Sequence, residues 1–432
     1  MSLFSQAIVE LAQRVKNAEE QDIRITQPIA NAPVSSCIDW LEAQPHFPKF
    51  YWQSRDTREE VVALGKVHTF SDPAPAYTIL SDDQRVWGGK AFQTSEYTDT
   101  QSYFFLPQIE LVRFDKQWSV SVNLADDKDQ IIAALEKLIV DVQPLAPISV
   151  EIKQISHTPD KPGWKTQVED VLTHIEQDKF KKVVLARKSR VRLDSAISSA
   201  QLLKASLSKN HHSFHFLFAL NKEQSFIGST PERLYSRVGL ELETEALAGT
   251  IGRGETAQKD LDLANWLAQD KKNLKENQYV VDDIIDRLTP HAESIEAQDE
   301  AKLIRLTKVQ HLKREIRAHL KAGVNGVQLL AALQPTAAVA GLPREEAMQY
   351  ILQNQPFSRG WYSGSIGYIS HRKAEFCVAL RSALVRGENV DLYAGAGIVT
   401  GSEAEYEWQE LDNKMSTLLC LIQGNWPLGV AS

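Results

Sequence analysis

The sequence is poor in cysteine. Its 432 residues include three, Cys37, Cys377 and Cys420, which are far apart and form no CxxC pair. Disulfide frameworks and thiolate zinc sites need paired or closely spaced cysteines, so neither is expected. The 11 histidines form no HExxH-like cluster, which argues against a histidine metal site. We therefore expect reduced thiols in a cytoplasmic protein.

A surplus of positive charge and a long apolar run are also missing. The 48 Lys and Arg against 56 Asp and Glu give a formal net charge of −8, which argues against a nucleic-acid partner. No apolar run is long enough to span a bilayer, so no membrane association is expected. The N-terminus spaces Phe4, Ile8, Leu11 and Val15 as one face of an amphipathic helix that charged residues interrupt, unlike a signal peptide.

What remains is globular composition, with 43% hydrophobic and 24% charged residues. Prolines and glycines concentrate in residues 142–164 and break regular structure there. We expect a strand-rich N-terminal region over 1–150 that packs on the same fold, and a catalytic region over 160–425. Strand pairs and separate helical blocks, including helical sequence over about 257–288, predict an α+β fold.

Two titratable residues stand beside predicted strands. The stretch "KKVVLARKSR" is a predicted strand in which Lys182 shares a face with Val184 and Ala186. In "GSTPERL" a turn is predicted at 228–231, and Glu232 follows its proline. Taken alone, each is better explained as a solvated residue at a strand end.

Glutamates gather on two predicted helices. Glu276 of "DKKNLKENQYVVDDI" shares one helical stripe with Asn273, Val280 and Asp283, although a surface ion pair with Lys272 would also explain it. Glu403, Glu407 and Glu410 line up beside the apolar stripe of the last helix. The helix dipole explains Glu403 but not Glu410, which lies two turns in. Carboxylates from two helices with few histidines suit Mg²⁺.

The C-terminal strands contain one arginine among small side chains. If "EFCVALRSALV" is one strand, Arg381 shares a face with Cys377, Ala379 and Ala383. That arrangement leaves room for a flat anion, which a guanidinium binds in a bidentate manner. The glycines of "YAGAGIV" and the loop "QPTAAVAGLP" indicate close approach of a ligand to the backbone.

These stretches together resemble the chorismate-utilising enzymes, which include isochorismate synthases, salicylate synthases and the large subunits of anthranilate and aminodeoxychorismate synthases. The motifs "KVVLAR", "GSTPERL", "TEALAGT", "DKKNLKEN", "QPTAAVAGLP", "LRSA", "YAGAGIV" and "EWQELDNK" occur in the family's order over about residues 163–423. "FYWQSR" and "RVWGGKAF" extend the likeness, in particular to isochorismate synthases of the menaquinone pathway.

The resemblance implies two antiparallel sheets sandwiched between helices. It also implies which residues act as base, acid and metal ligands. Lys182 would be the base that activates water for attack at C2 of chorismate, and Glu232 the acid that protonates the departing C4 hydroxyl. Desolvation in a closed cleft favours a neutral amine and a protonated carboxyl group together. Glu276 and Glu410 would hold Mg²⁺, with Glu407 as an outer partner.

The resemblance also implies the substrate contacts. Arg381 and Tyr362 would bind the enolpyruvyl carboxylate with the amides around Gly395 and Gly397. Further residues that it places near the substrate are Gly249, Thr250, His311 and Ala338; for His311 a packing role is an equal alternative.

The implied activity is Mg²⁺-dependent isochorismate synthesis, with menaquinone as the favoured pathway. A salicylate synthase or a siderophore-pathway isochorismate synthase is the alternative, and a metal-dependent binding protein is disfavoured by the acid and base. Salicylate-forming relatives have a threonine where this chain has Ala338, which favours isochorismate as the product. We expect a monomer or homodimer without a glutaminase subunit.

Overall fold

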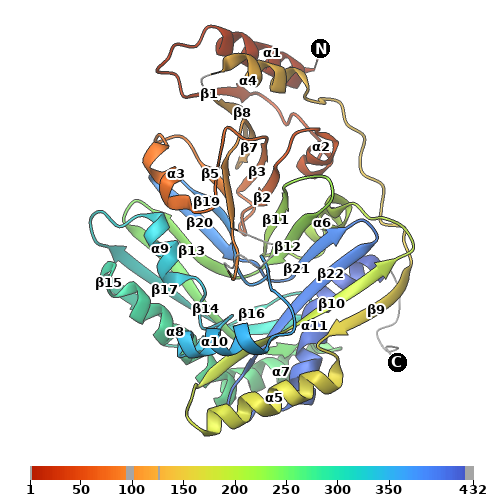
Figure 1. Ribbon diagram of the computed structural model, residues 1–432, viewed down its shortest axis with the longest axis vertical. Helices are drawn as coiled ribbons and strands as arrows, with labels where there is room; N and C mark the ends of the chain where they lie inside the picture. The colour runs from red at the N-terminus through yellow and green to blue at the C-terminus, as the bar shows by residue number, and fades with distance from the viewer. Residues whose placement is uncertain (1, 94–101, 125–126, 424–432) are drawn as a thin grey trace.

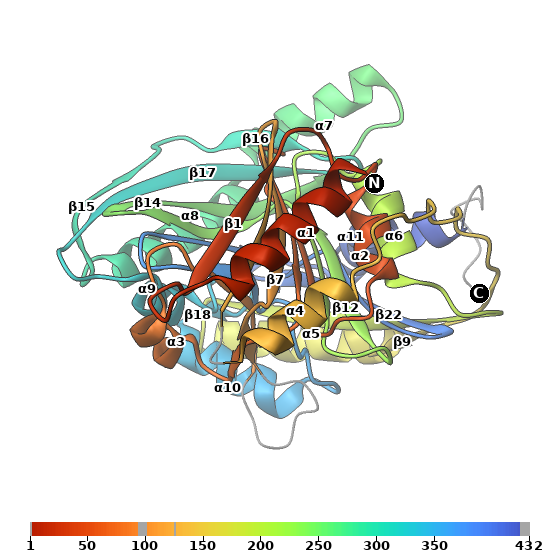
Figure 2. The ribbon, with the colours of Figure 1, turned by 90° about the horizontal axis from the view of Figure 1, so that it is seen from above.

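Two large antiparallel sheets form the centre of the molecule, with helices outside them (Figures 1 and 2). The computed structural model describes residues 2–93, 102–124 and 127–423. The predicted α+β sandwich is confirmed. No helix in these described ranges has both the length and the apolar character needed to cross a membrane.

Among the described residues, the larger sheet has 12 strands and the smaller has 10. The larger sheet, in spatial order, consists of β1 (Arg24–Ile29), β8 (Gln117–Asn123), β7 (Ile109–Phe114), β3 (Glu59–Leu64), β2 (Lys49–Gln53), β11 (Phe214–Ala219), β12 (Ser225–Thr230), β21 (Ser382–Arg386), β22 (Asn389–Ile398), β10 (Lys182–Leu193) and β18 (Gly341–Leu342), with β9 (Ile152–Thr158) on β10. The smaller sheet consists of β15 (Ala292–Ala297), β17 (Val309–Leu320), β14 (Glu241–Gly252), β13 (Arg233–Val238), β20 (Lys373–Val378), β19 (Ser365–Ile369), β5 (Val86–Lys90), β6 (Tyr103–Leu106) and β4 (His68–Phe70), with β16 (Lys302–Arg305) on β17.

The helices cover both sheets. They are α1 (Leu3–Lys16), α2 (Cys37–Ala43), α3 (Pro73–Ile79), α4 (Lys128–Glu136), α5 (Lys161–Glu176), α6 (Ser199–Leu207), α7 (Ala257–Gln269), α8 (Lys271–Leu288), α9 (Gly326–Leu333), α10 (Arg344–Asn354) and α11 (Ala404–Gln423). α8 packs on β14 and β17 of the smaller sheet, and α11 packs on β22 of the larger one. The predicted N-terminal helix is confirmed, with Phe4, Ile8, Leu11 and Val15 buried.

A layer of aromatic side chains separates the sheets. Phe50 and Phe218 of the larger sheet are buried with Trp87 of the smaller one. The rings of Phe50 and Trp87 lie 5.3 Å apart. Burial of such large side chains is the main force that holds the two sheets together.

The N-terminal strands continue both sheets. β2 pairs with β11, and β5 pairs with β19. In Figure 1 the red and orange N-terminal strands accordingly lie next to green and blue strands in the same sheets. Residues 138–151 contain neither helix nor strand, but hydrogen-bonded ladders join the strands on the N-terminal side of this segment to those on its C-terminal side. The division into regions at 150–160 stays a prediction.

Two expected elements are interrupted. The helical sequence over 257–288 forms two helices, because Asp270 ends α7 and caps α8 through the backbone N–H of Asn273. The expected single strand over 375–385 is wrong. β20 ends at Val378 in the smaller sheet and β21 begins at Ser382 in the larger one, so Arg381 lies between sheets.

Candidate active site

The chain crosses between the sheets at two adjacent places, and each crossing carries a predicted site residue. The first joins β12 to β13 through Pro231 and Glu232, so the turn lies later than predicted. The second joins β20 to β21 and contains Arg381. The two crossings are hydrogen-bonded to each other, since Val378 N–H donates to the Glu232 carbonyl at 3.0 Å and Ser229 N–H to the Arg381 carbonyl at 3.1 Å.

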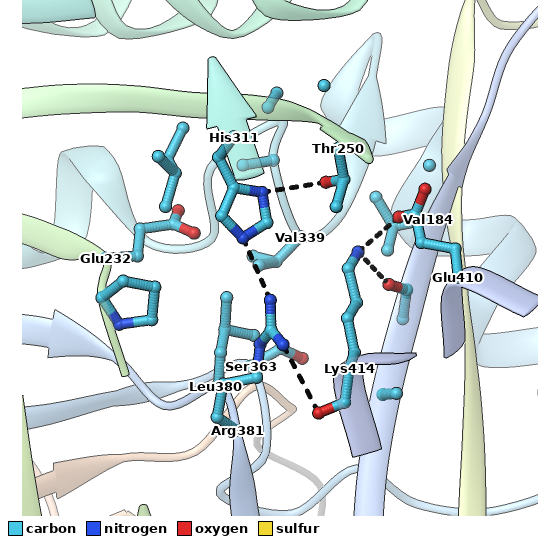
Figure 3. A pocket seen from close by; sticks show the side chains of 18 of the residues that line it. Val184, Glu232, Thr250, His311, Val339, Ser363, Leu380, Arg381, Glu410 and Lys414 are labelled. Atoms are coloured by element: carbon cyan, nitrogen blue, oxygen red, sulfur yellow. Dashed lines mark hydrogen bonds and ion pairs between the residues drawn. The ribbon is translucent and has the colours of Figure 1, made fainter. Parts of the chain in front are cut away.

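A pocket opens beside these crossings, with about 690 Å³ of space free of protein atoms when its open, solvent-filled mouth is included. Figure 3 shows side chains from both sheets and from α11 converging on it. Most of the predicted site residues line it: Glu232, Gly249, Thr250, Glu276, His311, Ala338, Tyr362, Arg381, Gly395, Gly397 and Glu410. Lys182 and Glu407 are not among the lining residues.

Glu232 is a carboxylic acid at neutral pH. Its side chain points into the pocket (Figure 3) and the residue is 4% exposed. Burial, followed by the negative charge of Glu245, raises the pKa of Glu232 to about 8, although Lys182, Lys414 and Arg381 act in the opposite direction. A carboxyl group that keeps its proton at pH 7 can serve as a general acid.

Lys182 is fully buried beside Glu276. Its Nζ lies 3.0 Å from Glu276 Oε1, an ion-pair distance. The alignment is too poor for a hydrogen bond, and Nζ has no other hydrogen-bond partner among the described residues. A Cβ atom on Gly397 would lie 2.4 Å from Glu276 Oε1 and 2.8 Å from Lys182 Cε. This glycine therefore makes the space in which the two charged groups meet.

The predicted metal ligands come from α8 and α11. Glu276 and Glu410 line the same pocket, whereas Glu407 is buried and accepts a hydrogen bond from Lys272 Nζ at 2.8 Å. Burial and the neighbouring charge of Glu410 raise the pKa of Glu407. Within the described ranges no three His, Cys, Asp or Glu residues are grouped closely enough to hold a metal. Two carboxylates facing one pocket still fit Mg²⁺, which retains waters and takes further oxygens from a substrate.

Arg381 is a buried guanidinium held by neutral partners. It adopts a left-handed backbone conformation with φ of 47°, unusual for a side chain of this size. Its Nη2 lies 3.0 Å from His311 Nε2, and its Nη1 donates to Thr417 Oγ1 at 3.3 Å. No carboxylate of the described chain lies within 4.0 Å of it. A buried arginine without an anionic partner is suited to bind an anionic ligand.

His311 sits behind Arg381 as a neutral side chain. Burial, Arg381 and Lys414 lower the pKa of His311 well below 6.5. Because a guanidinium only donates, His311 Nε2 accepts from Arg381, and Nδ1 carries the proton that it donates to Thr250 Oγ1 at 2.9 Å. The histidine thereby orients the arginine (Figure 3).

Tyr362 stacks on Tyr393, with ring centroids 5.2 Å apart. Burial raises the pKa of Tyr362 to about 12, so its hydroxyl remains a donor. A Cβ on Gly395 would lie 2.8 Å from that hydroxyl. The glycines of "AGAG" were expected to let a ligand approach the backbone. Gly395 and Gly397 also leave room for the side chains of the protein itself.

Lys414 is a pocket cation to which the sequence assigned no role. Its Nζ lies 2.6 Å from Glu410 Oε1 and donates to the Gly395 carbonyl at 2.8 Å. The spacing of four residues from Glu410 on one helix would have indicated it.

The comparisons with known proteins show the family to which the chain belongs. The family model described as "Chorismate binding enzyme" matches residues 80–423. The protein named isochorismate synthase MenF of Escherichia coli (strain K12) is 40% identical over 396 residues, covering 89% of this chain and 90% of the relative. The solved structure of MenF, described as the menaquinone-specific isochorismate synthase from Escherichia coli, superposes with a TM-score of 0.90 at 37% identity, covering 98% of this chain and 100% of the other.

A more distant structure shares the fold alone. Anthranilate synthase component I from Streptococcus pneumoniae has a TM-score of 0.65 at 19% identity, covering 85% of this chain and 93% of that one. The chain belongs to the chorismate binding enzyme family, and the resemblance noted in the sequence is confirmed. It is an enzyme of the isomerase type within that family.

Proposed function

We propose that the protein is an isochorismate synthase that converts chorismate to isochorismate. The observation that carries the proposal is that one pocket is lined both by a protonated carboxyl group, Glu232, and by a buried guanidinium without a carboxylate partner, Arg381. Chorismate has carboxylates for the arginine and for a metal, and a C4 hydroxyl that leaves only when protonated. The name of the similar relatives supports the same reaction.

In the proposed reaction, water adds to C2 and the C4 hydroxyl departs as water while the ring double bonds shift. Lys182 in its neutral form takes a proton from the attacking water, and Glu232 gives its proton to the leaving oxygen. Glu276 covers Lys182 in this structure, so this carboxylate must turn away before water reaches the amine. Arg381 and Tyr362 hold the enolpyruvyl carboxylate.

We further propose that Glu276 and Glu410 hold Mg²⁺, with Glu407 as an outer partner. The chemistry that Mg²⁺ supplies when bound is neutralisation of the substrate's ring carboxylate. All three carboxylates have a lysine beside them, but Glu276 and Glu410 line the pocket and Glu407 does not. The description of the similar solved structure as menaquinone-specific favours a role in quinone synthesis.

The test uses purified protein, chorismate and Mg²⁺, with and without EDTA, in water enriched in the heavy oxygen isotope. We expect a metal-dependent, reversible mixture of chorismate and isochorismate, with solvent oxygen at C2. Metal-dependent binding of chorismate without turnover would contradict the proposal.

Product choice depends on Ala338, whose methyl group lines the pocket. A methyl group cannot hold the enolpyruvyl chain over the ring, the pose needed for pyruvate elimination, so positioning for that step is missing. Fluorescence should show salicylate only at the background rate, and Ala338→Thr should raise it. Salicylate formed by the unmodified protein as fast as chorismate disappears would contradict the assignment.

A further inference from the structure

Glu232 lies on a two-residue crossing between sheets, and an ion pair outside the pocket grips the peptide on both sides of it. Arg55, in the turn between β2 and β3, donates through Nη1 to the Pro231 carbonyl at 2.7 Å. Glu245 of β14 accepts from the Arg233 N–H at 3.0 Å. Arg55 and Glu245 are themselves joined by two hydrogen bonds of 2.5 and 2.9 Å.

This arrangement is rigid and shielded from solvent. The side chains of Arg55 and Glu245 are 18% and 3% exposed, and the guanidinium lies 5.4 Å from the ring centroid of Phe214. A bidentate arginine–carboxylate pair fixes direction as well as distance. Arg55, 176 positions from Pro231, and Glu245, 12 positions from Arg233, thus meet at the residues that flank Glu232.

We propose that Arg55 and Glu245 are positioning residues for Glu232, which fix the place of its carboxyl group in the pocket by holding the peptide groups before and after it. The inference rests on the proposed role of Glu232 as general acid. It gives the N-terminal region a share in catalysis, although none of the described residues of that region lines the pocket.

The pair also acts on the charge around Glu232. The groups that act electrostatically on this carboxyl are Glu245 from β14, Lys182 from β10, Lys414 from α11 and Arg381 from the second crossing, while Tyr362 and Cys377 are coupled to it. Glu245 in turn faces Arg55, and Lys313 Nζ lies 3.6 Å away. Loss of the Glu245 charge lowers the pKa of Glu232. Loss of Arg55 leaves the negative charge of Glu245 less neutralised, and this raises the pKa of Glu232.

The kinetic test compares Arg55→Met and Arg55→Lys with the control Arg58→Met. Arg58 lies on the same hairpin and pairs with Asp115 at 3.0 Å, but its side chain is 57% exposed, and its hydrogen bonds among the described residues are to Asp56 and Asp115 and not to the crossing. For Arg55→Met we expect kcat to fall about 10- to 100-fold with KM for chorismate changed less than about threefold. Arg55→Lys should recover part of kcat, and Arg58→Met should match wild type. Wild-type kcat in Arg55→Met would overturn the proposal.

The second measurement is independent of turnover. The infrared band of the protonated Glu232 carboxyl group, identified by its loss in Glu232→Gln, is titrated in each variant. Glu245→Gln keeps an acceptor for the Arg233 N–H, so the fold is retained, and the band should titrate at lower pH than in wild type. In Arg55→Met it should titrate at higher pH. Shifts in the same direction, or none, would overturn the proposal.

The two proposals fail in different ways. If Glu232→Gln keeps wild-type kcat, the acid is wrongly assigned and the proposed function fails, while the infrared shifts still measure the grip of the ion pair. If Glu232→Gln is inactive but the Arg55 variants behave like Arg58→Met, only the positioning role is refuted. Should Arg55→Met not fold, Arg55→Lys and Glu245→Gln carry the test through the same two measurements.

Discussion

Gly397→Ala should lower activity about 100-fold and leave the fold intact. The new Cβ would lie 2.4 Å from Glu276 Oε1, about 1 Å short of ordinary contact, and 2.8 Å from Lys182 Cε. Both atoms belong to flexible side chains and the glycine does not have a positive φ, so the chain can accommodate a methyl group by displacing them. Displacing a catalytic group by about 1 Å can cost roughly 100-fold in rate, about 2.7 kcal/mol of activation free energy.

The assay measures kcat and the Mg²⁺ concentration for half-maximal rate, with thermal unfolding as the check on folding. Gly252→Ala is the matched control, because its Cβ would lie 3.5 Å from Asn413 Nδ2, an ordinary contact. We expect Gly397→Ala to be about 100-fold slower and to need more Mg²⁺, with an unfolding midpoint close to that of wild type. A fully active Gly397→Ala with unchanged metal response would show that the placement of Lys182 and Glu276 beside this glycine does not matter for catalysis or metal binding.

Other residues of the site can be tested in the same assays. Lys182→Ala should lose about 10²–10⁴-fold in kcat without unfolding, and a loss below tenfold would contradict its role as base. Glu276→Gln or Glu410→Gln should raise the Mg²⁺ requirement in a metal titration, whereas the exposed Glu403→Gln should not, and equal effects would indicate a diffuse acidic patch. Activity should fall as pH rises through about 8, the pKa of Glu232. The unfolded chain releases this proton above about 4.5 whereas the folded state keeps it, so the free energy of unfolding should fall as pH rises from about 4.5 to about 8. In denaturant titrations, Glu232→Gln should abolish this pH dependence.

Local patterns were enough for the elements that carry the site. A β-branched run predicted β10 with Lys182, and helical periodicity placed Glu276 on one stripe with Asp283. Both depend on short-range physics, since side-chain direction repeats every two residues in a strand and every 3.6 in a helix. The order of family motifs then indicated which of these residues meet.

The crossings between sheets were not predictable in this way. Alternation of side chains is the same whether a strand continues or passes to another sheet, so "EFCVALRSALV" has the pattern of one strand although it breaks before Arg381. The contact of Arg55 with Pro231 joins residues 176 positions apart, and only packing brings them together. The buried partners of Glu232 are tertiary features for the same reason.

The ladders that carry N-terminal strands into both sheets limit how the chain can be divided. A fragment that began after residues 138–151 would leave β11 and β19 as open sheet edges, and β11 has all six residues buried in the intact molecule. Such long apolar edges pair with other chains, so the fragment should aggregate. Recombination between relatives at that segment would need matching strand registers in both ladders as well as matching sequences.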